Sequence, residues 1–351
     1  MDKTVGYAVV GLGVGKAHVR GAIAAQGCRL VALCDIRPEQ LENARKISGA
    51  EDAATYTDFA EMLQNPEIDV VSVCTPSGLH AEMAVQALRA GKNVLVEKPM
   101  DITVDKILQI EAARRETGLK VGGIFQNRRN AIMEPFKAAV DGGRLGEIYA
   151  GFFRVNWHRD DDYFLQNGGW RGTWAMDGGG SLMNQAVHTV DLMQWLLGDV
   201  ESVKSHMRVV NHKIETEDFT QSTIKFKRGT IATLVSTTSA YPGLGTELQL
   251  TGTEGSIHID GDKVIAWKLK NDSDELEDAE EAEMKAKFGG KHASVSADPT
   301  VVRGHSFQIQ DMVDAVRFDR DPMVGPMEAT KAVRIINAVY ESARTGKEII
   351  F

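Results

Sequence analysis

A glycine-rich turn close to the start of the chain sets the strongest limit on the fold. The apolar run 6–10 leads into Gly11-Leu12-Gly13-Val14-Gly15, and a helical pattern follows at once. A second apolar run, 28–34, ends at Asp35. Strand, glycine turn, helix, strand and acid, in that order, are typical of a βαβ unit that binds a dinucleotide. The alternative is a tight glycine turn that holds no ligand.

The glycines of this turn have different roles. Gly11 permits the tight turn, and Gly13 lets a pyrophosphate approach the backbone at the helix N-terminus. The third glycine of the usual pattern is out of register, because position 16 is lysine and Gly15 comes one residue early. This spacing predicts a shortened turn. We expect the cofactor to contact the following residues of this unit: Gly11, Gly13, Val14, Asp35, Ile36 and Arg37.

The acid at the end of the second run favours NAD over NADP. The carboxylate of Asp35 can bind the ribose hydroxyls of NAD, whereas it would repel the 2′-phosphate of NADP. Arg37 stands two residues further on and can tolerate that phosphate. We therefore expect NAD, with NADP as the alternative.

Further apolar runs continue the alternation of strands and helices. Residues 70–74 have the pattern of a buried strand, and a helix over 78–89 follows, with His80 in its first turn. Residues 93–96 and 120–125 have the pattern of two more strands. Strands that alternate with helices predict a parallel sheet. We expect a Rossmann dinucleotide-binding domain over residues 1–127.

A charged pair ends the strand at 93–96. Glu97-Lys98-Pro99 stands at a carboxyl strand end, which is where open α/β sheets bind their ligands. The ammonium group of Lys98 has three donors and can orient and polarise a substrate oxygen. The alternatives are a salt-bridged lysine at the sheet edge and, for His80, a capping or packing role.

The second part of the chain, residues 128–351, has a different pattern. Short alternating strands dominate from 200 to 267, which predicts a large, mostly antiparallel open sheet in an α+β domain. Between 158 and 177 lies an irregular stretch rich in aromatic residues, arginine and glycine. Within it, Trp170 and Arg171 are suited either to simple packing or to binding an anionic group beside a cofactor. We expect this domain to bind the substrate.

A predicted helix from 177 to 197 carries three polar side chains at helical spacing. Asn184 and His188 are one turn apart on the same face, and Asp191 lies three residues further on. Histidine is suited to abstracting a proton from a secondary alcohol, because its ordinary pKa is near neutrality. The alternative is a core histidine. We expect His188 and Lys98 to meet in one pocket between the domains.

The chain resembles the Gfo/Idh/MocA oxidoreductases, which include glucose-fructose oxidoreductase and inositol dehydrogenase. The resemblance is carried by Thr75-Pro76, by His80 and by the run AGKNVLVEKP at 90–99, and it covers nearly the whole chain. Within that family, the stretches 126–128 and 177–185 bring the chain closest to sugar 3-dehydrogenases, including those acting on nucleotide-linked N-acetylglucosaminuronate.

The resemblance implies roles for particular residues. Lys98, Asn184 and His188 match the catalytic positions, but Asn184 stands where aspartate is commoner and cannot accept a proton, so the base is His188. His305 matches a position where relatives carry a tyrosine that faces the active site. The cofactor contacts implied in addition to those of the first unit are Thr75, Pro76, His80, Glu97, Lys98, Gln126, Trp170 and Arg171.

Composition excludes several functions. The net charge of -9 argues against general nucleic-acid binding, and no apolar run is long enough to span a bilayer. Three cysteines without metal-type spacing, together with the absence of a signal peptide, predict a cytoplasmic protein without a metal site. The acidic segment 271–286 is either a solvated helix or a mobile excursion, and we assign it no chemistry.

These patterns together predict an NAD(P)-dependent dehydrogenase or reductase. The enzyme transfers a hydride between nicotinamide and a secondary alcohol or ketone of a sugar, glycoside or cyclitol. Two alternatives stay open: an NAD-using glycosidase with transient oxidation at C3, and a noncatalytic nucleotide-binding regulator. We expect a homodimer or homotetramer, with no nucleic-acid or membrane partner. The resemblance implies that the open face of the second sheet forms the subunit contact. Ile231 and Leu234 are expected on that face, for which exposure to solvent is the alternative.

Overall fold

The chain divides into two compact units. The computed structural model describes residues 4–288 and 303–351. The first unit comprises Met1–Gln126, Ala175–Gly178 and Pro299–Val333, and the second comprises Asn127–Trp174, Gly179–Asp298 and Arg334–Phe351. The first boundary falls one residue before the expected one at 127. The first unit also takes in two later segments of the chain, which the expected division placed in the second domain.

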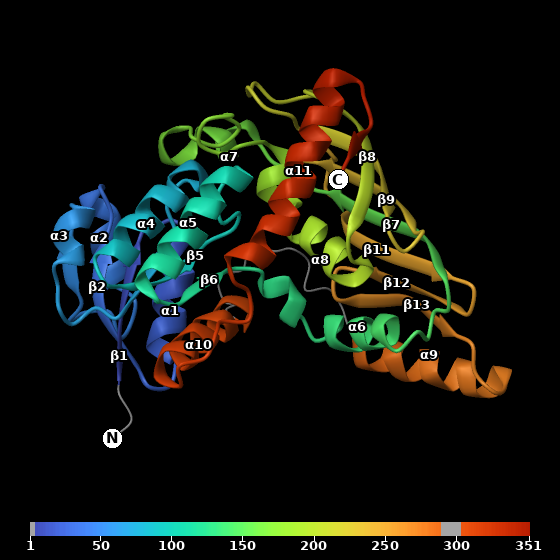
Figure 1. Cartoon of the computed structure of the whole chain (residues 1–351), viewed down its shortest axis with the longest axis horizontal. Helices are drawn as coiled ribbons and strands as arrows, with labels where there is room; N and C mark the ends of the chain where they lie inside the picture. Colours follow the sequence, from blue (N-terminus) through green and yellow to red (C-terminus); the bar gives the residue numbers. More distant parts are fainter. Residues whose placement is uncertain (1–3, 289–302) are drawn as a thin grey trace. The chain divides into compact units, whose positions relative to one another are not determined.

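The first unit is built on a parallel sheet (Figure 1). The strands lie in the order β3-β2-β1-β4-β5-β6, and each pairs in parallel with its neighbours. This arrangement confirms the predicted Rossmann sheet. The strands are β1 (Val5–Val10), β2 (Cys28–Cys34), β3 (Ala54–Tyr56), β4 (Val70–Val73), β5 (Asn93–Val96) and β6 (Val121–Gly123).

Helices flank this sheet, and one of them comes from the far end of the sequence. The apolar stripe of α10 (Arg303–Arg317) contributes Ile309, Met312 and Val313 to the core of the first unit. A side chain at Gly21 of α1 (Gly15–Ala24) would meet Ile309 Cδ1 at 2.3 Å, so α10 packs closely on α1 at this glycine. Burial of this stripe explains why residues beyond 299 belong to the first unit. The other helices are α2 (Pro38–Arg45), α3 (Phe59–Leu63), α4 (His80–Arg89) and α5 (Val104–Thr117).

The second unit holds an eight-stranded sheet in the order β13-β12-β11-β7-β10-β9-β8-β14. Only β7 and β10 pair in parallel, and the other neighbours are antiparallel, which confirms the predicted mostly antiparallel sheet. The strands are β7 (Ile148–Asn156), β8 (Val200–Arg208), β9 (Phe219–Phe226), β10 (Ile231–Thr237), β11 (Gly245–Gly252), β12 (Gly255–Asp260), β13 (Lys263–Leu269) and β14 (Ile349–Ile350).

One face of this sheet is covered by helices and the other is open. α6 (Met133–Asp141) and α8 (Val187–Leu197) lie on the covered face (Figure 1). Ile231 and Leu234 were both expected on the open face, but they are three positions apart and point to opposite faces. Leu234 is fully buried, whereas Ile231 is 52% exposed. On the neighbouring strand β7, Tyr149 and Phe152 are exposed apolar residues. They are also three positions apart, but the pairing of β7 with β11 shifts register at Tyr149, which interrupts the strict alternation there.

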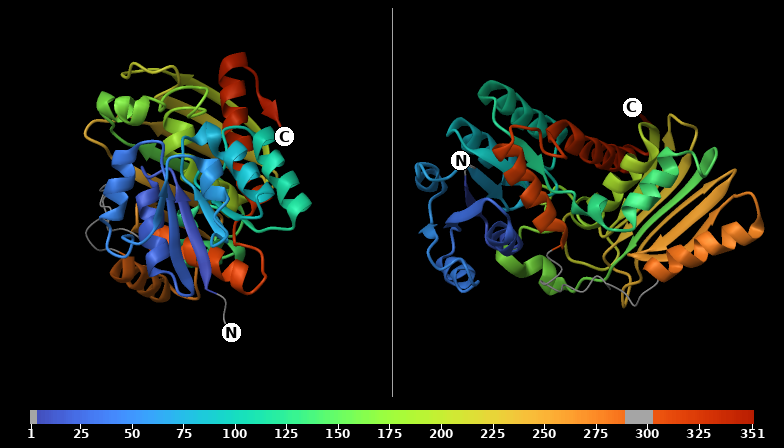
Figure 2. Two further views of the ribbon diagram at one scale, coloured as in Figure 1. Left: turned by 90° about the vertical axis from the view of Figure 1, so that its left-hand side faces the viewer. Right: turned by 90° about the horizontal axis from the view of Figure 1, so that it is seen from below.

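The acidic segment forms an ordered helix, α9 (Asp274–Phe288), along strand β13 (Figure 2, right). Trp267 of β13 donates its indole N–H to Glu280 at 3.1 Å, and Lys268 pairs with Asp278 and Glu281. Burial tends to raise the pKa of Glu281, but bonds from Lys285 and Lys268 lower it to about 2. The acidic side chains therefore attach α9 to the edge strand.

The last helix is α11 (Pro326–Thr345), and a short helix, α7 (Asp161–Leu165), lies in the irregular stretch 158–177. Within residues 4–288 and 303–351, no helix is long and apolar enough to cross a membrane.

Candidate active site

The glycine turn after β1 has the geometry that a dinucleotide requires. Gly11 has a φ of +84°, and a side chain there would lie 2.6 Å from the backbone of Cys74. A side chain on Gly13 would meet nothing within 4 Å, so a pyrophosphate has room to approach this backbone. Gly15 is the first residue of α1, and a side chain there would lie 3.0 Å from Val9 Cγ1. Gly15 thus performs the helix–strand packing expected of the third glycine, one residue early.

Asp35 ties this turn to the end of β2. Its Oδ2 accepts the Leu12 N–H at 2.8 Å, and its Oδ1 accepts the Arg37 N–H at 3.0 Å. The neighbouring Ile36 is 84% exposed and Val14 is 47% exposed. Two exposed apolar side chains close to a fixed carboxylate suit an adenosine, whose ribose binds the acid and whose base covers apolar surface. These residues therefore fit an NAD cofactor.

His80 links the loops that follow β4 and β5. Its Nδ1 lies 2.8 Å from the Pro99 carbonyl oxygen, and its Nε2 lies 2.9 Å from the Thr75 carbonyl oxygen. Both ring nitrogens are therefore engaged within the first unit, and the side chain is buried. In this geometry His80 joins the Thr75-Pro76 and Lys98-Pro99 loops.

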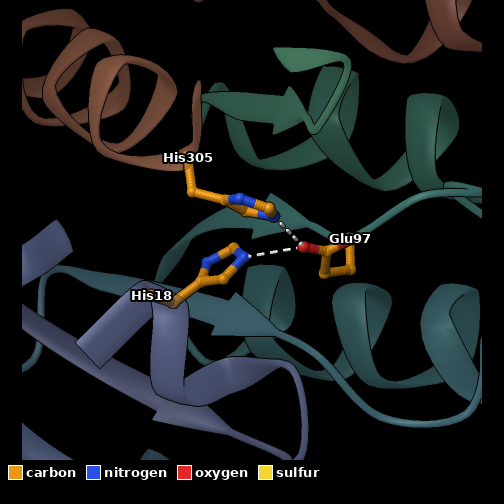
Figure 3. Close-up of side chains that lie close together, drawn as sticks. All are labelled: His18, Glu97 and His305. Atoms are coloured by element: carbon orange, nitrogen blue, oxygen red, sulfur yellow. Dashed lines mark hydrogen bonds and ion pairs between the residues drawn. The ribbon is translucent and has the colours of Figure 1, made fainter. Parts of the chain in front are cut away.

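Glu97 is the centre of a buried cluster at the end of β5 (Figure 3). Its Oε1 accepts from His18 Nε2 at 3.0 Å and from His305 Nε2 at 2.9 Å, and its Oε2 accepts the Lys98 N–H at 2.9 Å. Burial tends to raise the pKa of Glu97, but the bonds from His18 and His305 hold it well below its ordinary value. Glu97 was expected to contact the cofactor, yet both of its oxygens are held by the protein.

His18 was not predicted to be a site residue. His18 lies in α1, just after the glycine turn, but its carboxylate partner is 79 positions away.

Lys98 itself is half-buried at the end of β5. Gln126 packs against Gly304, where a side chain would lie 2.7 Å from its Cβ and Cγ. The buried Oε1 of Gln126 has no hydrogen-bond partner among the described residues.

In the second unit, the predicted helix from 177 to 197 is two helical pieces. A π-helix, η4 (Ser181–Gln185), precedes α8, and Gly198 follows the end of α8 as expected. The Met183 N–H bonds the Tyr340 hydroxyl at 3.2 Å, and Glu217 takes the preceding N–H groups. The single-helix expectation was wrong because these distant partners hold the first turn in a wider form. π-Turns of this kind occur often at functional sites.

Glu217 fills the N-terminus of this helical segment. Its carboxylate accepts the N–H groups of Gly180, Ser181 and Leu182 at 3.0, 3.0 and 3.1 Å. It also accepts the hydroxyls of Ser181 at 2.5 Å and Tyr340 at 2.7 Å. Burial raises the pKa of Glu217 above its ordinary value although these donors lower it. The N-terminus is therefore occupied by the protein's own carboxylate.

The glycines at this entry serve packing. A side chain on Gly179 would lie 2.0 Å from the Tyr340 hydroxyl, and one on Gly180 would lie 1.9 Å from the Glu217 carbonyl oxygen. Only glycine permits Tyr340 and Glu217 to approach the backbone this closely.

The three polar residues of this segment do not act as one face. Arg128 donates to both Asp191 oxygens, from Nε at 2.7 Å and from Nη2 at 2.5 Å. Asp191 is therefore committed to a buried ion pair. Asn184 and His188 are nearly buried, at 8% and 9% exposure, and remain the candidate catalytic groups of the second unit.

A polar network surrounds Asn184 and was not predicted. Its Oδ1 accepts from Gln185 Nε2 at 3.0 Å and from the Tyr163 hydroxyl at 3.3 Å. Gln185 Nε2 also lies 2.6 Å from the Tyr163 hydroxyl, and Gln185 Oε1 accepts from Arg159 Nη2 at 3.1 Å. Both of these donors face Oδ1, so this oxygen of Asn184 is used within the second unit.

Arg171 and Trp170 lie in the same unit beside Tyr163. The Arg171 guanidinium lies 4.6 Å from the centre of the Tyr163 ring and 4.9 Å from that of Trp170. Its buried Nη1 has no hydrogen-bond partner among the described residues. A cation held between two rings with an unused donor is suited to binding an anionic group.

The fold and these groups define a class of protein. A parallel sheet of this strand order, an open glycine turn and an acid after β2 define a dinucleotide-binding domain. The end of β5 carries a lysine and α8 carries a histidine, two residue types that can donate or accept a proton. The class is therefore a nicotinamide-dependent oxidoreductase.

Comparison with known families agrees with this class. Residues 5–124 match the oxidoreductase family with an NAD-binding Rossmann fold, and residues 134–258 match the GFO/IDH/MocA C-terminal domain. The chain belongs to the Gfo/Idh/MocA oxidoreductase family and is an NAD(P)-dependent oxidoreductase acting on CH–OH groups. The family expected from the Glu97-Lys98-Pro99 motif is confirmed.

Several relatives span most of the chain. It is 24% identical to the NAD-dependent scyllo-inositol 2-dehydrogenase of Bacillus subtilis over 99% of this chain and 97% of the relative. It is 30% identical to the 1,5-anhydro-D-fructose reductase of Ensifer adhaerens over 70% of this chain and 72% of the relative. The crystal structure of the WlbA dehydrogenase from Bordetella pertussis, in complex with NADH and UDP-GlcNAcA, has a TM-score of 0.88 at 31% identity, covering 100% and 99% of the two chains.

Proposed function

We propose that this protein oxidises or forms a secondary alcohol of a sugar, glycoside or cyclitol. One observation carries the proposal: the chain combines the dinucleotide turn with Lys98 at the end of β5 and with His188 and Asn184 on η4 and α8. The relatives named above act on a cyclitol and an anhydro sugar, and the solved relative binds a nucleotide-linked sugar.

The proposed roles follow from the chemistry of the side chains. His188 takes the hydroxyl proton of the substrate, because a neutral imidazole is a base near physiological pH. Lys98 donates to the same oxygen and polarises it, and Asn184 orients the substrate through its amide N–H. Bound nicotinamide supplies the hydride acceptor at C4, so the carbinol carbon becomes a ketone carbon.

The substrate that we favour carries a negative charge. Arg159 and Arg171 both lie over the Tyr163 ring, at 5.3 and 4.6 Å, and Tyr163 bonds Asn184. Two guanidinium groups close to a proposed substrate-orienting amide are suited to a carboxylate or phosphate. The solved WlbA relative holds UDP-GlcNAcA, which carries both groups. We therefore rank nucleotide-linked hexuronates first among the sugars to be tested.

A substrate screen tests this function. Three alcohols are each incubated with NAD or NADP, and NAD(P)H absorbance is recorded. They are UDP-GlcNAcA, scyllo-inositol and the alcohol formed when the ketone of 1,5-anhydro-D-fructose is reduced. Net formation of NAD(P)H with one of these supports the dehydrogenase. Release of an aglycone from a glycoside without net NADH indicates the glycosidase instead. Nucleotide binding without either activity indicates the regulator.

Replacing Asp35 with serine should weaken NAD binding more than NADP binding. The serine hydroxyl is too short to hold both the Leu12 N–H and the ribose, and the carboxylate that repels a 2′-phosphate is lost. We expect Kd for NAD to rise by roughly 10-fold or more, in line with the loss of charged hydrogen bonds. Calorimetric titration of both cofactors measures this. Unchanged affinity for NAD would show that the ribose binds elsewhere.

We also propose that two copies of the chain associate through the open sheet face of the second unit. Tyr149, Phe152 and Ile231 are 53%, 51% and 52% exposed on adjacent strands β7 and β10. Exposed apolar side chains gathered on a sheet face favour a protein contact. The self-associated form is a dimer, or a tetramer when dimers pair.

Phe152→Arg should convert the oligomer to a monomer, since it buries a charge at the centre of the proposed contact. Sedimentation velocity over a range of concentrations measures the change. Phe318→Arg is the control, because Phe318 is 59% exposed in the first unit and lies outside the sheet. A wild-type chain that sediments as a monomer at every concentration would refute the contact.

We further propose a cytoplasmic location. Cys28, Cys34 and Cys74 are all free thiols. Burial raises the pKa of Cys28 and of Cys34 to about 12, and raises that of Cys74 well above its ordinary value. Protonated, buried thiols suit a reducing compartment.

A further inference from the structure

A chain of hydrogen bonds runs through the first unit beneath the Lys98 loop. The Tyr7 hydroxyl lies 2.5 Å from Ser72 Oγ, and Ser72 Oγ lies 2.8 Å from His18 Nδ1. His18 Nε2 and His305 Nε2 then converge on Glu97 Oε1 at 3.0 and 2.9 Å (Figure 3). These hydrogen bonds thus join β1, β4, α1, α10 and the end of β5. The four side chains Tyr7, Ser72, His18 and Glu97 are all at most 2% exposed.

The proton positions in this chain follow from its ends. Glu97 is ionised and can only accept, so both histidines donate to it from Nε2. Burial lowers the pKa of His18 although Glu97 raises it, so His18 is neutral and its Nδ1 must accept from Ser72. Ser72 then accepts from the Tyr7 hydroxyl, whose pKa burial raises well above its ordinary value. Every hydrogen is used once, and every bond points toward Glu97.

This arrangement fixes Lys98 at its backbone. The second oxygen of Glu97 accepts the Lys98 N–H, and the first is held from two sides. Only an anion offers acceptors to all three donors at once, since a protonated carboxyl would set its own hydrogen against one of them. The direction in which Lys98 leaves β5 therefore depends on Glu97 remaining ionised in a buried site.

We propose that His18 and His305 are positioning residues for the reaction. They keep Glu97 ionised, Glu97 fixes the Lys98 peptide, and the Lys98 ammonium is thereby presented to the substrate oxygen. The inference rests on the proposed function, in which Lys98 polarises that oxygen. It assigns His305, which replaces a tyrosine implied by the family resemblance, a role through Glu97 rather than on the substrate.

The same three groups have the composition of a metal site, since their ligand atoms lie within 4.8 Å of one another. The separations favour hydrogen bonds. Tetrahedral zinc with ligand bonds of about 2.0–2.1 Å places its ligand atoms roughly 3.3 Å apart. The observed 2.9 and 3.0 Å between each Nε2 and Oε1 are hydrogen-bond lengths.

Paired substitutions at His305 test the positioning role. Glutamine keeps an N–H donor and leucine does not, and the His305 side chain is 17% exposed, so replacement does not open the deepest part of the core. We expect His305→Leu to lower kcat by roughly 10- to 100-fold, as for the loss of a hydrogen bond to a charged group. His305→Gln should stay within about 3-fold of wild type because one donor remains. KM for the sugar and Kd for NAD should change little in both.

The pH profile gives a readout that a purely structural role would not move. The titratable groups that act on or sense Glu97 are His18, His305 and Cys74, with Lys98 adjacent in the chain. Its pKa is lowered by the two histidines, so loss of one raises it, and Glu97 becomes protonated at a higher pH. The loss of kcat that accompanies protonation of Glu97 should therefore occur at a higher pH in His305→Leu than in wild type, and at the wild-type pH in His305→Gln.

Three further measurements complete the test. If His305→Leu does not fold, His305→Ala with added imidazole replaces it, and imidazole should restore activity. His206→Leu, an exposed position on β8, is the matched control and should behave as wild type. Dialysis against EDTA should leave activity unchanged, whereas loss of activity that Zn²⁺ restores would overturn the proposal in favour of a metal site.

The outcomes separate this inference from the function on which it rests. If Lys98→Met abolishes turnover while His305→Leu and His305→Gln are indistinguishable, only the positioning role fails. If Lys98→Met is itself fully active, the proposed function fails first.

Discussion

Lys98→Met and His188→Ala should each lower kcat by about 10²- to 10⁴-fold, the usual contribution of a general acid or base. Methionine retains the length and apolar stem of Lys98 but has no donor for the substrate oxygen. Alanine at position 188 removes the only side chain of that segment assigned to accept the hydroxyl proton, since Asn184 cannot accept one. NAD affinity should survive both changes, because neither residue is assigned to the adenosine half.

The double variant carries the sharper information. If both residues act on the same oxygen, the losses should be strongly non-additive, and Lys98→Met/His188→Ala should be little slower than the worse single variant. Steady-state kinetics on the best substrate of the screen gives kcat for the wild type, the two single variants and the double variant. NAD binding is measured separately. Additive losses would show that the two residues act at separate steps, and near-normal turnover in either single variant would remove that residue from the mechanism.

Matched controls exist for both positions. Lys92 precedes the same strand at its amino end and donates to the Asn65 carbonyl oxygen at 2.9 Å. Lys92→Met should lower stability slightly, because that oxygen then keeps only the Ile68 N–H at 3.3 Å among the described residues, but should leave kcat unchanged. His206→Ala on β8 is the corresponding histidine control.

The residues around the glycine turn show how much local chemistry reveals. Gly11, Gly13 and Asp35 predicted the parallel unit correctly, because each constraint acts within about 25 residues of chain and glycine is required by backbone geometry alone. The alternating strands of the second unit were equally readable, because burial on one face imposes a period of two. Ile231 and Leu234 were both expected on the open face, but their odd spacing places them on opposite faces of the sheet.

The parts that sequence reasoning missed depend on partners far away in the chain. Glu97 is joined to His18 over 79 positions and to His305 over 208, so no local pattern could pair them. The π-turn before α8 follows from Glu217 and Tyr340, the latter 157 positions beyond Met183. Likewise, α10 belongs to the first unit because its apolar stripe is buried on α1, and amphipathic spacing does not say which unit a helix will cover.

Glu217→Gln should have the largest effect on folding among single isosteric changes in the second unit. The wild-type carboxylate accepts five bonds, three from backbone N–H groups and two from hydroxyls. A glutamine amide can accept at only one of its two positions. Its NH₂ group then faces either Gly180 and Leu182 N–H with the Tyr340 hydroxyl, or the Ser181 N–H and hydroxyl. In the first arrangement, the Gly180 and Leu182 N–H groups lose their acceptor. In the second, the Ser181 N–H keeps its bond to the Glu217 carbonyl oxygen at 3.0 Å, and the bonds from Ser181 to the charged side chain are lost.

We expect the free energy of unfolding to fall by about 1.5–3 kcal/mol, since bonds to a charged group are lost in either arrangement. Chemical denaturation at neutral pH measures the loss. Glu215→Gln is the control, because Glu215 is exposed. Among the described residues, its carboxylate accepts one hydrogen bond, from the backbone N–H of Trp174 at 3.2 Å. Glu217→Gln should also lower kcat, because η4 carries Asn184 and is held in its π form by the bonds to the Glu217 carboxylate. A stable Glu217→Gln protein with normal kcat would show that the π-turn forms without this carboxylate.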